Sequence, residues 1–196
     1  MSRPKQFDRD AVLHLAMLLF WRKGYEATST EDLVKAMGIG RQSMYDTFGD
    51  KHAIFLEALE RYVRTEVGGL QHALSGAASP LQAIEGILFS VSAERHEERR
   101  RGCLLMNSTI ECAEGDADVR KVVTSSARRI ETEFQRAVER AQTLGELPAR
   151  VDARAAGRFL FATLQGLRAA AKSDAPPPAL RDIAHLALRG VDASAS

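Results

Sequence analysis

Apolar residues recur along most of the chain at the spacing of amphipathic helices. In the first such segment they occupy positions i, i+3, i+4, i+7 and i+8, namely Val12, Leu15, Ala16, Leu19 and Phe20. Asp8 precedes this segment as a helix cap does, and Gly24 follows it as a C-terminal stop. No segment keeps the alternation that is typical of strands, so the pattern predicts an all-α fold of about nine helices.

Turn and cap residues divide the rest of the chain into helices. Ser29 and Asp32 fit a capping box, and Gly38 is placed to end the short helix that they begin. Asp50 is placed to begin a long helix that ends near residue 70. The other helices are expected at about 41–47, 80–94, 103–113, 117–143, 152–172 and 179–190. We expect the charged run 94–102 to be a loop or a frayed helix end.

The short helix at 41–47 has two different faces. Met44 and Phe48 lie four residues apart, so they share one face and can pack on the preceding helix. Gln42 and Asp46 point to the opposite side. A polar stripe on a helix that follows a glycine turn is typical of a helix-turn-helix, whose second helix enters the major groove of DNA. An ordinary helical hairpin with a solvated face gives the same pattern.

A longer segment decides between these interpretations. Residues 19–59, "LFWRKGYEATSTEDLVKAMGIGRQSMYDTFGDKHAIFLEAL", resemble the TetR family of one-component bacterial transcriptional regulators. They have its apolar first helix, Gly-aromatic turn, Thr/Ser cap and G-[VI]-x-x-x-x-[LM]-Y-x-x-F-x-x-K core. The resemblance implies a three-helix DNA-binding domain over residues 1–50 and a larger helical domain for effector binding and dimerisation over 51–196. It also implies a dimeric repressor that releases its operator when a small molecule binds.

The resemblance also assigns individual residues to DNA. It places Arg41, Gln42 and Tyr45 nearest the bases, and Thr30, Ser43, Thr47 and Lys51 nearest the phosphates. The chemistry agrees, because arginine pairs with guanine and glutamine with adenine in the major groove. Lys51 also begins a helix, and the N-terminus of a helix attracts phosphate.

Two carboxylates, Glu31 and Asp46, lie where phosphates are expected. We expect each to be angled away, to bond to a base, or to pair with a cation such as Arg41 or Lys51. For Asp46 the alternatives are an intramolecular pair, a hydrogen bond from cytosine N4, and a solvated side chain.

The segment 152–172 is apolar on nearly all sides, which predicts a helix that meets its own core on one face and a second chain on the other. With the last helix, the resemblance implies a four-helix bundle between two subunits. The residues expected there are Phe159, Leu160, Leu164, Leu167, Ile183 and Leu186. A bundle within one chain is the alternative.

The effector pocket is expected among the middle helices. Its candidate lining residues are Phe55, Leu59, Tyr62, Ile87, Val91, Cys103, Met106, Asn107, Ile110 and Phe134. Apolar residues at helical spacing are equally consistent with an ordinary core. Because few of the candidates are polar, the set favours an apolar or aromatic effector.

Cys103 suggests a different kind of response. It follows three arginines in "ERRRGC", which could favour the thiolate and make the residue a sensor of electrophiles or oxidants. The alternative is a small buried hydrophobic residue. Cys112 is nine residues away, so we expect no disulfide between the two.

Composition narrows the remaining function classes. The net charge of +1 neither requires nor excludes a nucleic-acid partner. The five histidines are dispersed and form no metal motif, and no glycine-rich phosphate loop is present. We therefore expect no enzyme, no cofactor and no metal. The start of the chain, "MSRPKQFDRD", is polar and lacks the apolar stretch of a signal peptide. The apolar segment that follows it is too short to span a membrane, so we expect a cytoplasmic protein. The expected partners are double-stranded operator DNA, a small effector and a second copy; a DNA-binding regulator without an effector is the alternative.

Overall fold

The computed structural model describes residues 7–193, and within that range all of the regular secondary structure is α-helical. Its ten helices are α1 (Arg9–Lys23), α2 (Thr30–Met37), α3 (Arg41–Phe48), α4 (Lys51–Ser75), α5 (Pro80–Ala93), α6 (His96–Arg101), α7 (Leu104–Glu111), α8 (Ala117–Thr143), α9 (Ala153–Lys172) and α10 (Pro177–Ala193). The all-α prediction is confirmed. The additional helix is α6, which forms from the charged run that was expected to be a loop or a frayed helix end.

The predicted caps begin and end the first helices. The Asp8 carboxylate accepts hydrogen bonds from the amides of Asp10 and Ala11, at 2.9 and 3.2 Å. Ser29 and Asp32 form the predicted capping box at the start of α2. Gly38 ends α2 in the left-handed conformation, with φ of 66°, which a glycine adopts without strain. These short-range contacts explain why the boundaries of α1 and α2 could be predicted.

The helix α10 begins two residues earlier than the predicted start at 179. Its first residues are Pro177 and Pro178, which lie before that predicted start. Proline is accepted in the first turn of a helix because the amide that it lacks has no partner there. The two prolines therefore start α10 rather than precede it.

The chain forms two compact units. The first comprises the described residues up to Thr65 together with Leu104–Val123. Its core holds α1 against α4 through aromatic contacts: the rings of Phe20 and Phe55 are 5.0 Å apart, and those of Trp21 and Tyr62 are also 5.0 Å apart. The predicted division into a DNA-binding domain up to residue 50 and a second domain after it stays a prediction.

The buried face of α1 differs in one position from the predicted stripe. Leu15 is 42% exposed, whereas Leu13 and Met17 are buried. Because α1 has apolar residues on several sides, spacing alone did not identify the side that meets the core.

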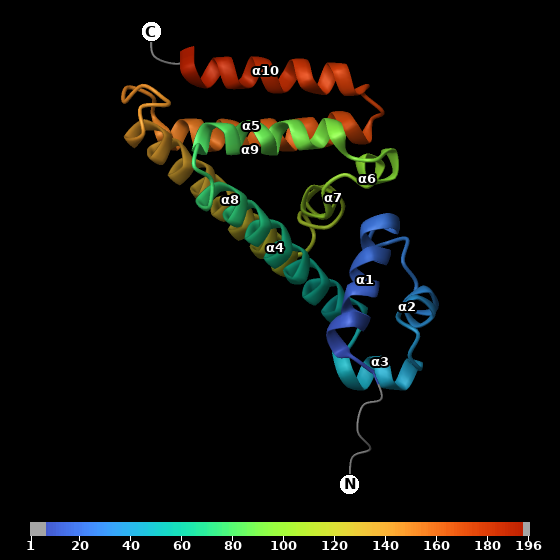
Figure 1. The fold of residues 1–196 in the computed structure, drawn as a ribbon. Coiled ribbons are helices and arrows are strands. Elements are labelled where there is room, and N and C mark those ends of the chain that lie inside the picture. The colour runs from blue at the N-terminus through green and yellow to red at the C-terminus, as the bar shows by residue number, and fades with distance from the viewer. Residues whose placement is uncertain (1–6, 194–196) are drawn as a thin grey trace. The chain divides into compact units, whose positions relative to one another are not determined.

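The second unit comprises Glu66–Cys103 and the residues from Thr124 onward. In it α10 lies beside α5 and α9 (Figure 1). The helices α8 and α9 approach closely at Gly157, where a Cβ atom would lie 2.8 Å from the backbone oxygen of Glu131. Only glycine fits this crossing, which forms within one chain. Gly166, also in α9, makes no such contact, because no atom of another element lies within 4 Å of its Cβ position.

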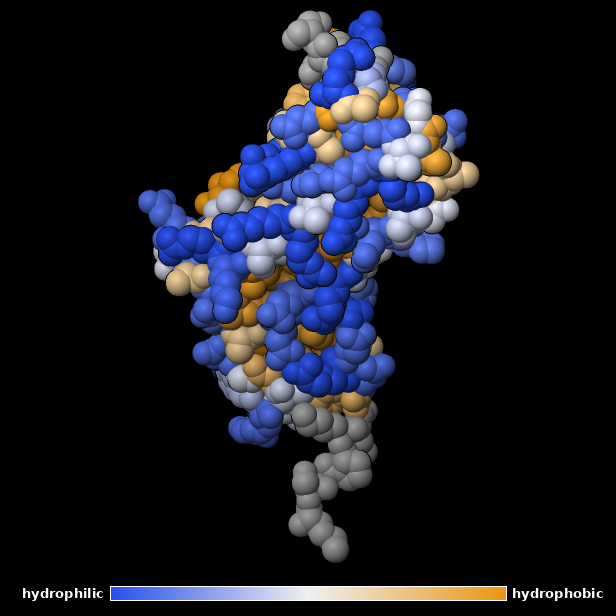
Figure 2. All heavy atoms as spheres, turned by 90° about the vertical axis from the view of Figure 1, so that its left-hand side faces the viewer, coloured by the Kyte–Doolittle hydropathy of each residue, from blue (hydrophilic) through white to orange (hydrophobic). Residues whose placement is uncertain are grey.

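One face of the molecule is mainly polar. Figure 2 shows one face on which hydrophilic side chains cover most of the area and smaller apolar areas lie between them. Among residues 7–193, none of the helices has both the length and the apolar content that crossing a lipid bilayer requires.

Candidate nucleic-acid interface

The helices α2 and α3 form the helix-turn-helix predicted from the sequence. The amide of Gly38 donates to the carbonyl of Val34, 3.1 Å away, and α3 begins directly after Gly40. Met44 and Phe48 are buried, with 0% and 4% of their surfaces exposed, as their spacing predicted. These two side chains hold α3 in the first unit and turn its other face outward.

The outward face of α3 carries the predicted DNA-contacting residues. Arg41, Gln42, Ser43 and Tyr45 are exposed, and Thr47 is half-buried at the C-terminal end. Thr30, the first residue of α2, is also half-buried. Their contacts with DNA stay a prediction, but the structure leaves the face that carries them open to a partner.

Asp46 pairs with a neutral amide. The Nε2 group of Gln42 donates to Asp46 Oδ1 at 2.8 Å, one turn further along α3. The two cations suggested as partners, Arg41 and Lys51, instead make other contacts. Asp46 therefore has an intramolecular partner, as one of the alternatives stated, but this partner carries no positive charge.

Glu31 pairs with a cation, as expected. Its carboxylate accepts from the guanidinium of Arg41, so that the ion pair joins the first turns of α2 and α3. A hydrogen bond from its own backbone amide and the Arg41 guanidinium lower the pKa of Glu31. Both side chains are largely exposed, so the pair is weak and can be exchanged for DNA contacts.

The side chain of Lys51 extends over an aromatic ring. Its ammonium group lies 4.4 Å from the centroid of the Tyr25 ring, in a cation–π contact. The amide of Ala53, in the same first turn of α4, donates to the Asp50 carboxylate at 2.8 Å. One amide of the predicted phosphate site is therefore already occupied by Asp50.

A second ion pair joins α1 to α2. Lys23 donates to Asp32 at 2.6 Å, and Asp32 also accepts from the amide and the hydroxyl of Ser29. The Lys23 ammonium and the Ser29 donors hold the pKa of Asp32 well below its usual range. Asp32 thus stays ionised while it caps α2.

Sequence reasoning missed Glu111, which contacts the turn between α1 and α2. Its carboxylate accepts from the amides of Tyr25 and Glu26, at 3.0 and 2.8 Å. The residues are 86 and 85 positions apart in the sequence, so no local pattern could have revealed the contact. Glu111 thereby joins the end of α7 to the turn that precedes the helix-turn-helix.

A cluster of potential metal ligands was missed for the same reason. Ligand atoms of His52, Asp116 and Asp118 lie within 4.8 Å of one another. His52 Nε2 already bonds to Asp116 Oδ2 at 2.7 Å, and Asp116 Oδ1 accepts from the amides of Asp118 and Val119. Capping of α8 and a bond to α4 thus account for Asp116 without a metal.

The ten predicted ligand-binding residues are divided between the two compact units. The first unit holds Phe55, Leu59, Tyr62, Met106, Asn107 and Ile110, and the second holds Ile87, Val91, Cys103 and Phe134. Phe55 and Tyr62 are used in the aromatic contacts between α1 and α4. Packing within the core therefore accounts for these two, as the alternative interpretation stated.

Ile110 does not lie in a core. It is 79% exposed, because α7 turns Leu104, Leu105 and Ser108 inward and Ile110 lies on another side of the helix. Ile87, Met106 and Asn107 are half-buried, whereas Leu59, Val91 and Phe134 are fully buried.

The two cysteines are reduced and differ in environment. Cys103 is buried, with 4% of its surface exposed, which agrees with the alternative of a small hydrophobic residue. Cys112 is half-buried, and its burial, followed by the nearby carboxylate of Glu111, raises the pKa of its thiol to about 11.

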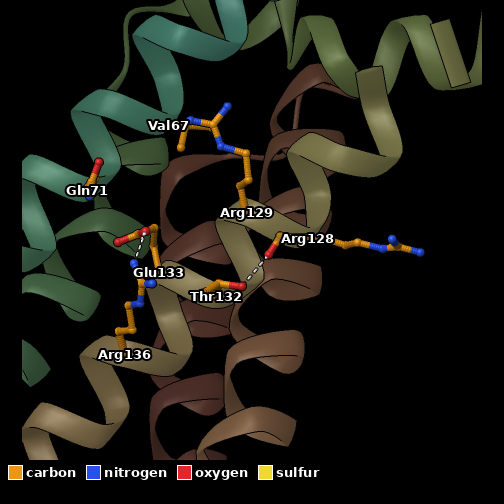
Figure 3. Close-up of a pocket in the computed structure, with 7 residues that line it drawn as sticks. All are labelled: Val67, Gln71, Arg128, Arg129, Thr132, Glu133 and Arg136. Carbon is orange, nitrogen blue, oxygen red and sulfur yellow. Dashed lines mark hydrogen bonds and ion pairs between the residues drawn. The ribbon is translucent and has the colours of Figure 1, made fainter. Parts of the chain in front are cut away.

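A groove of about 340 Å³ lies between α4 and α8 in the second unit. It is lined by Val67, Gln71, Arg128, Arg129, Thr132, Glu133 and Arg136 (Figure 3). Arg136 pairs with Glu133 at 3.0 Å, and the side chain of Arg128 points away from the α4 residues. The groove is mainly polar and contains none of the ten predicted ligand-binding residues, so it is not the apolar pocket that the sequence predicted.

The predicted dimer residues separate into two sets. Leu160, Leu164 and Leu167 are buried within the chain, which corrects their assignment to an intersubunit surface. The reason is that this face of α9 packs on the core of its own unit. Phe159, Ile183 and Leu186 are instead 45%, 43% and 64% exposed.

Comparisons with known proteins agree with the helix-turn-helix. Residues 12–58 match the family described as "Bacterial regulatory proteins, tetR family", and residues 80–190 match "Tetracyclin repressor-like, C-terminal domain". The second match covers more than half of the chain. The two families thus describe both the helices around α3 and the helices after α4.

Individual relatives are similar over nearly the whole chain. The uncharacterised HTH-type regulator YezE of Bacillus subtilis is 34% identical over 98% of this chain and all of its own. The HTH-type transcriptional repressor ComR of Escherichia coli is 31% identical over 96% of this chain and 90% of its own. A solved structure of CifR, a TetR-family regulator complexed with 26-bp operator DNA, is also similar. The two sequences are 31% identical, and the structures superpose with a TM-score of 0.83 over 96% of this chain and 98% of the CifR chain. The chain therefore belongs to the TetR family of helix-turn-helix transcriptional regulators.

Proposed function

We propose that this protein is a repressor that binds a palindromic operator as a dimer and releases it when a small apolar or aromatic molecule binds. The family is one of regulators rather than enzymes, so the chemistry to be explained is recognition. The observation that carries the proposal is the polar, exposed face of α3, which is held outward by the buried Met44 and Phe48. The operator complex of CifR supports the DNA partner, and the repressor ComR supports the direction of regulation.

The side chains on this face have the chemistry that DNA recognition needs. Arg41 and Gln42 lie in the first turn of α3, which enters the major groove first in a helix-turn-helix. Tyr45 is 39% exposed and presents a hydroxyl on a rigid ring. Ser43 and Thr47 offer hydroxyls to phosphates. The ion pair of Arg41 with Glu31 orients the guanidinium before DNA arrives and then competes with a guanine contact.

The exposed apolar residues of α9 and α10 support the dimer. Phe159 on α9 reaches α10, where its ring lies 4.0 Å from the Cβ position of Gly190. Ile183, Leu186 and Gly190 follow one another along one side of α10 at intervals of three and four residues. An apolar surface that continues from one helix to the next is suited to a second copy, and a two-fold dimer presents two α3 helices to a palindromic site.

The effector is proposed to bind in the second unit. The second unit contains four of the predicted ligand residues, Ile87, Val91, Cys103 and Phe134, of which Ile87 is half-buried. Apolar surroundings of this kind favour an apolar or aromatic effector. A reaction of Cys103 with an electrophile is the alternative; it requires the buried thiol to become accessible. If treatment with hydrogen peroxide releases DNA from the Cys103→Ser variant as from the native protein, this alternative is removed.

The proposal is tested by selection of the DNA sequences that the native protein binds. Purified protein is used to select duplexes from a random pool, and the molar mass of the complex is measured by light scattering. A palindromic consensus bound by two chains is expected. The selected complex is then titrated with a library of small apolar and aromatic compounds, and at least one should release the DNA. A non-palindromic consensus bound by one chain contradicts the dimer, and no release by any compound favours a regulator without an effector.

A further inference from the structure

Gln42 and Asp46 form a hydrogen-bonded pair on the exposed face of α3. Gln42 Nε2 donates to Asp46 Oδ1 at 2.8 Å. An ionised carboxylate can only accept hydrogen bonds, so the amide nitrogen of Gln42, and not its oxygen, must face Asp46. The carboxylate thereby fixes which way round the Gln42 carboxamide is held.

The fixed carboxamide still has a donor and an acceptor to offer. Of its two N–H groups one is used by Asp46, and the other remains beside the carbonyl oxygen. A donor next to an acceptor is complementary to the major-groove edge of adenine, where N7 accepts and the N6 amino group donates. Gln42 is therefore oriented to bind adenine with two hydrogen bonds, and binding loses less side-chain entropy because the side chain is already ordered.

Asp46 presents only acceptors to the groove. The exocyclic amino groups of adenine N6 and cytosine N4 can donate to it. Guanine shows two acceptors, N7 and O6, and thymine shows O4, so each would place lone pairs opposite the carboxylate. An arrangement of this kind selects partly by repelling the wrong base.

In the part of the chain that the structure describes, neither Arg41 nor Lys51 forms an ion pair with Asp46. Arg41 is paired with Glu31 on α2. Lys51 lies over the ring of Tyr25. A carboxylate without such a pair, on the face that is proposed to meet DNA, must lower the affinity for any duplex because the phosphates repel it.

We propose that Gln42 and Asp46 read DNA as one unit, in which Gln42 binds adenine and Asp46 orients Gln42 and excludes guanine and thymine from the adjoining position. This inference rests on the proposed function, since it concerns the operator that α3 binds. It gives the carboxylate a role in specificity: Asp46 lowers the affinity for DNA in general and increases the difference between the right and the wrong sequence.

The experiment measures base preference at every position of the operator. The native protein first selects its best duplex from a random pool. Fluorescence anisotropy then gives the dissociation constant for that duplex, for each single-base variant and for a random duplex. The same set is measured for Gln42→Ala, Asp46→Ala and Asp46→Asn. Glu60→Ala, which removes an exposed carboxylate from α4, is the control for a change of charge alone.

Each variant has its own expected profile. Gln42→Ala should lose about tenfold in affinity for the best duplex and its preference for adenine at one position. Asp46→Ala should bind the random duplex severalfold more tightly and accept guanine or thymine at the adjoining position about tenfold better. Asp46→Asn should also accept guanine, because the asparagine amide can donate to O6. Glu60→Ala should leave the profile unchanged.

Two results separate failure of this inference from failure of the proposed function. If Asp46→Ala lowers the melting temperature but keeps every base preference within twofold of the native values, Asp46 only supports the helix and the inference is overturned. If the native protein binds all duplexes alike, the proposed operator binding fails, and the reading unit fails with it.

Discussion

Glu111 lies so close to Gly24 that a Cβ atom at Gly24 would be 2.8 Å from Oε2 and 2.9 Å from Oε1 of its carboxylate. Gly24 has φ of 83° and ψ of 171°, a conformation that is restricted almost entirely to glycine. The carboxylate uses the space left by the missing side chain to bind the next two amides. The turn between α1 and α2 therefore depends on a residue from α7.

Substitution of Gly24 tests this contact. Gly24→Ala should lower the free energy of unfolding by about 2–3 kcal/mol, because backbone strain and the clash with Glu111 add together. The matched control is Gly38→Ala, because Gly38 has φ of 66° but no atom within 4 Å of its Cβ position. This substitution should lower the free energy of unfolding by about 1 kcal/mol. Chemical denaturation measures both. If the cost of Gly24→Ala is the same when Glu111 is also replaced by alanine, the clash is not part of it.

Asp116 should make stability depend on pH. Hydrogen bonds from the Val119 amide and from His52 lower the pKa of Asp116 below its ordinary value. The folded chain thus binds the proton less tightly than the unfolded chain, so the stabilisation is present above about pH 4 and is lost as the pH falls below it. Asp116→Ala should cost about 1 kcal/mol at pH 7.

The pH dependence separates this effect from simple loss of a cap. The gap in unfolding free energy between the native protein and Asp116→Ala should shrink as the pH is lowered from 5 to 2. Asp116→Asn is the matched control, because asparagine caps a helix about as well but carries no charge. A gap that stays constant over this range contradicts the role of the charge.

Cys112 should react slowly with alkylating reagents. Burial and neighbouring carboxylates raise the pKa of its thiol to about 11, so the reactive thiolate is scarce at pH 8. Labelling by iodoacetamide, followed by mass spectrometry that resolves the site, should proceed on the order of a hundredfold more slowly than for glutathione. The rate should rise steeply between pH 9 and 11. Labelling of Cys112 as fast as glutathione at pH 8 would show that its surroundings do not suppress the thiolate.

Leu186 tests the proposed dimer surface. Leu186→Glu places a charge in the exposed apolar surface of α9 and α10, and should shift the protein to monomer in sedimentation experiments. Leu144→Glu is the control: Leu144 is similarly exposed, at 57%, but follows α8 and lies outside that surface. A dimer that survives Leu186→Glu, or is lost equally in both variants, places the interface elsewhere.

The parts of the fold that could be predicted depend on neighbours in the sequence. Asp8 and Ser29 cap helices through amides two or three residues away, and Gly38 ends α2 by its own conformation. The contacts that could not be predicted join distant segments. Glu111 meets Tyr25 across 86 positions, and His52 meets Asp116 across 64.

The candidate sites show the same limit. Periodicity predicted that Met44 and Phe48 would be buried. It did not identify Gln42 as the partner of Asp46, because Arg41 and Lys51, each five residues from Asp46, offered the positive charge that Gln42 lacks. Nor could periodicity show that Phe159 is exposed and Leu160 buried, since α9 is apolar on nearly all sides. Which side meets the core depends on packing against other helices.

The central claim, that α3 reads bases while Lys51 binds phosphate, is tested most directly by one set of dissociation constants. Arg41→Ala, Lys51→Ala and the control Arg64→Ala, on the exposed side of α4, are measured with the selected operator and a random duplex over a series of salt concentrations. Arg41→Ala should cost about 1–3 kcal/mol on the operator and little on random DNA, and relax one base preference. Lys51→Ala should weaken both and reduce the salt slope by about one, with Arg64→Ala close to native. Equal losses on operator and random DNA for both Arg41→Ala and Lys51→Ala would contradict base reading by α3.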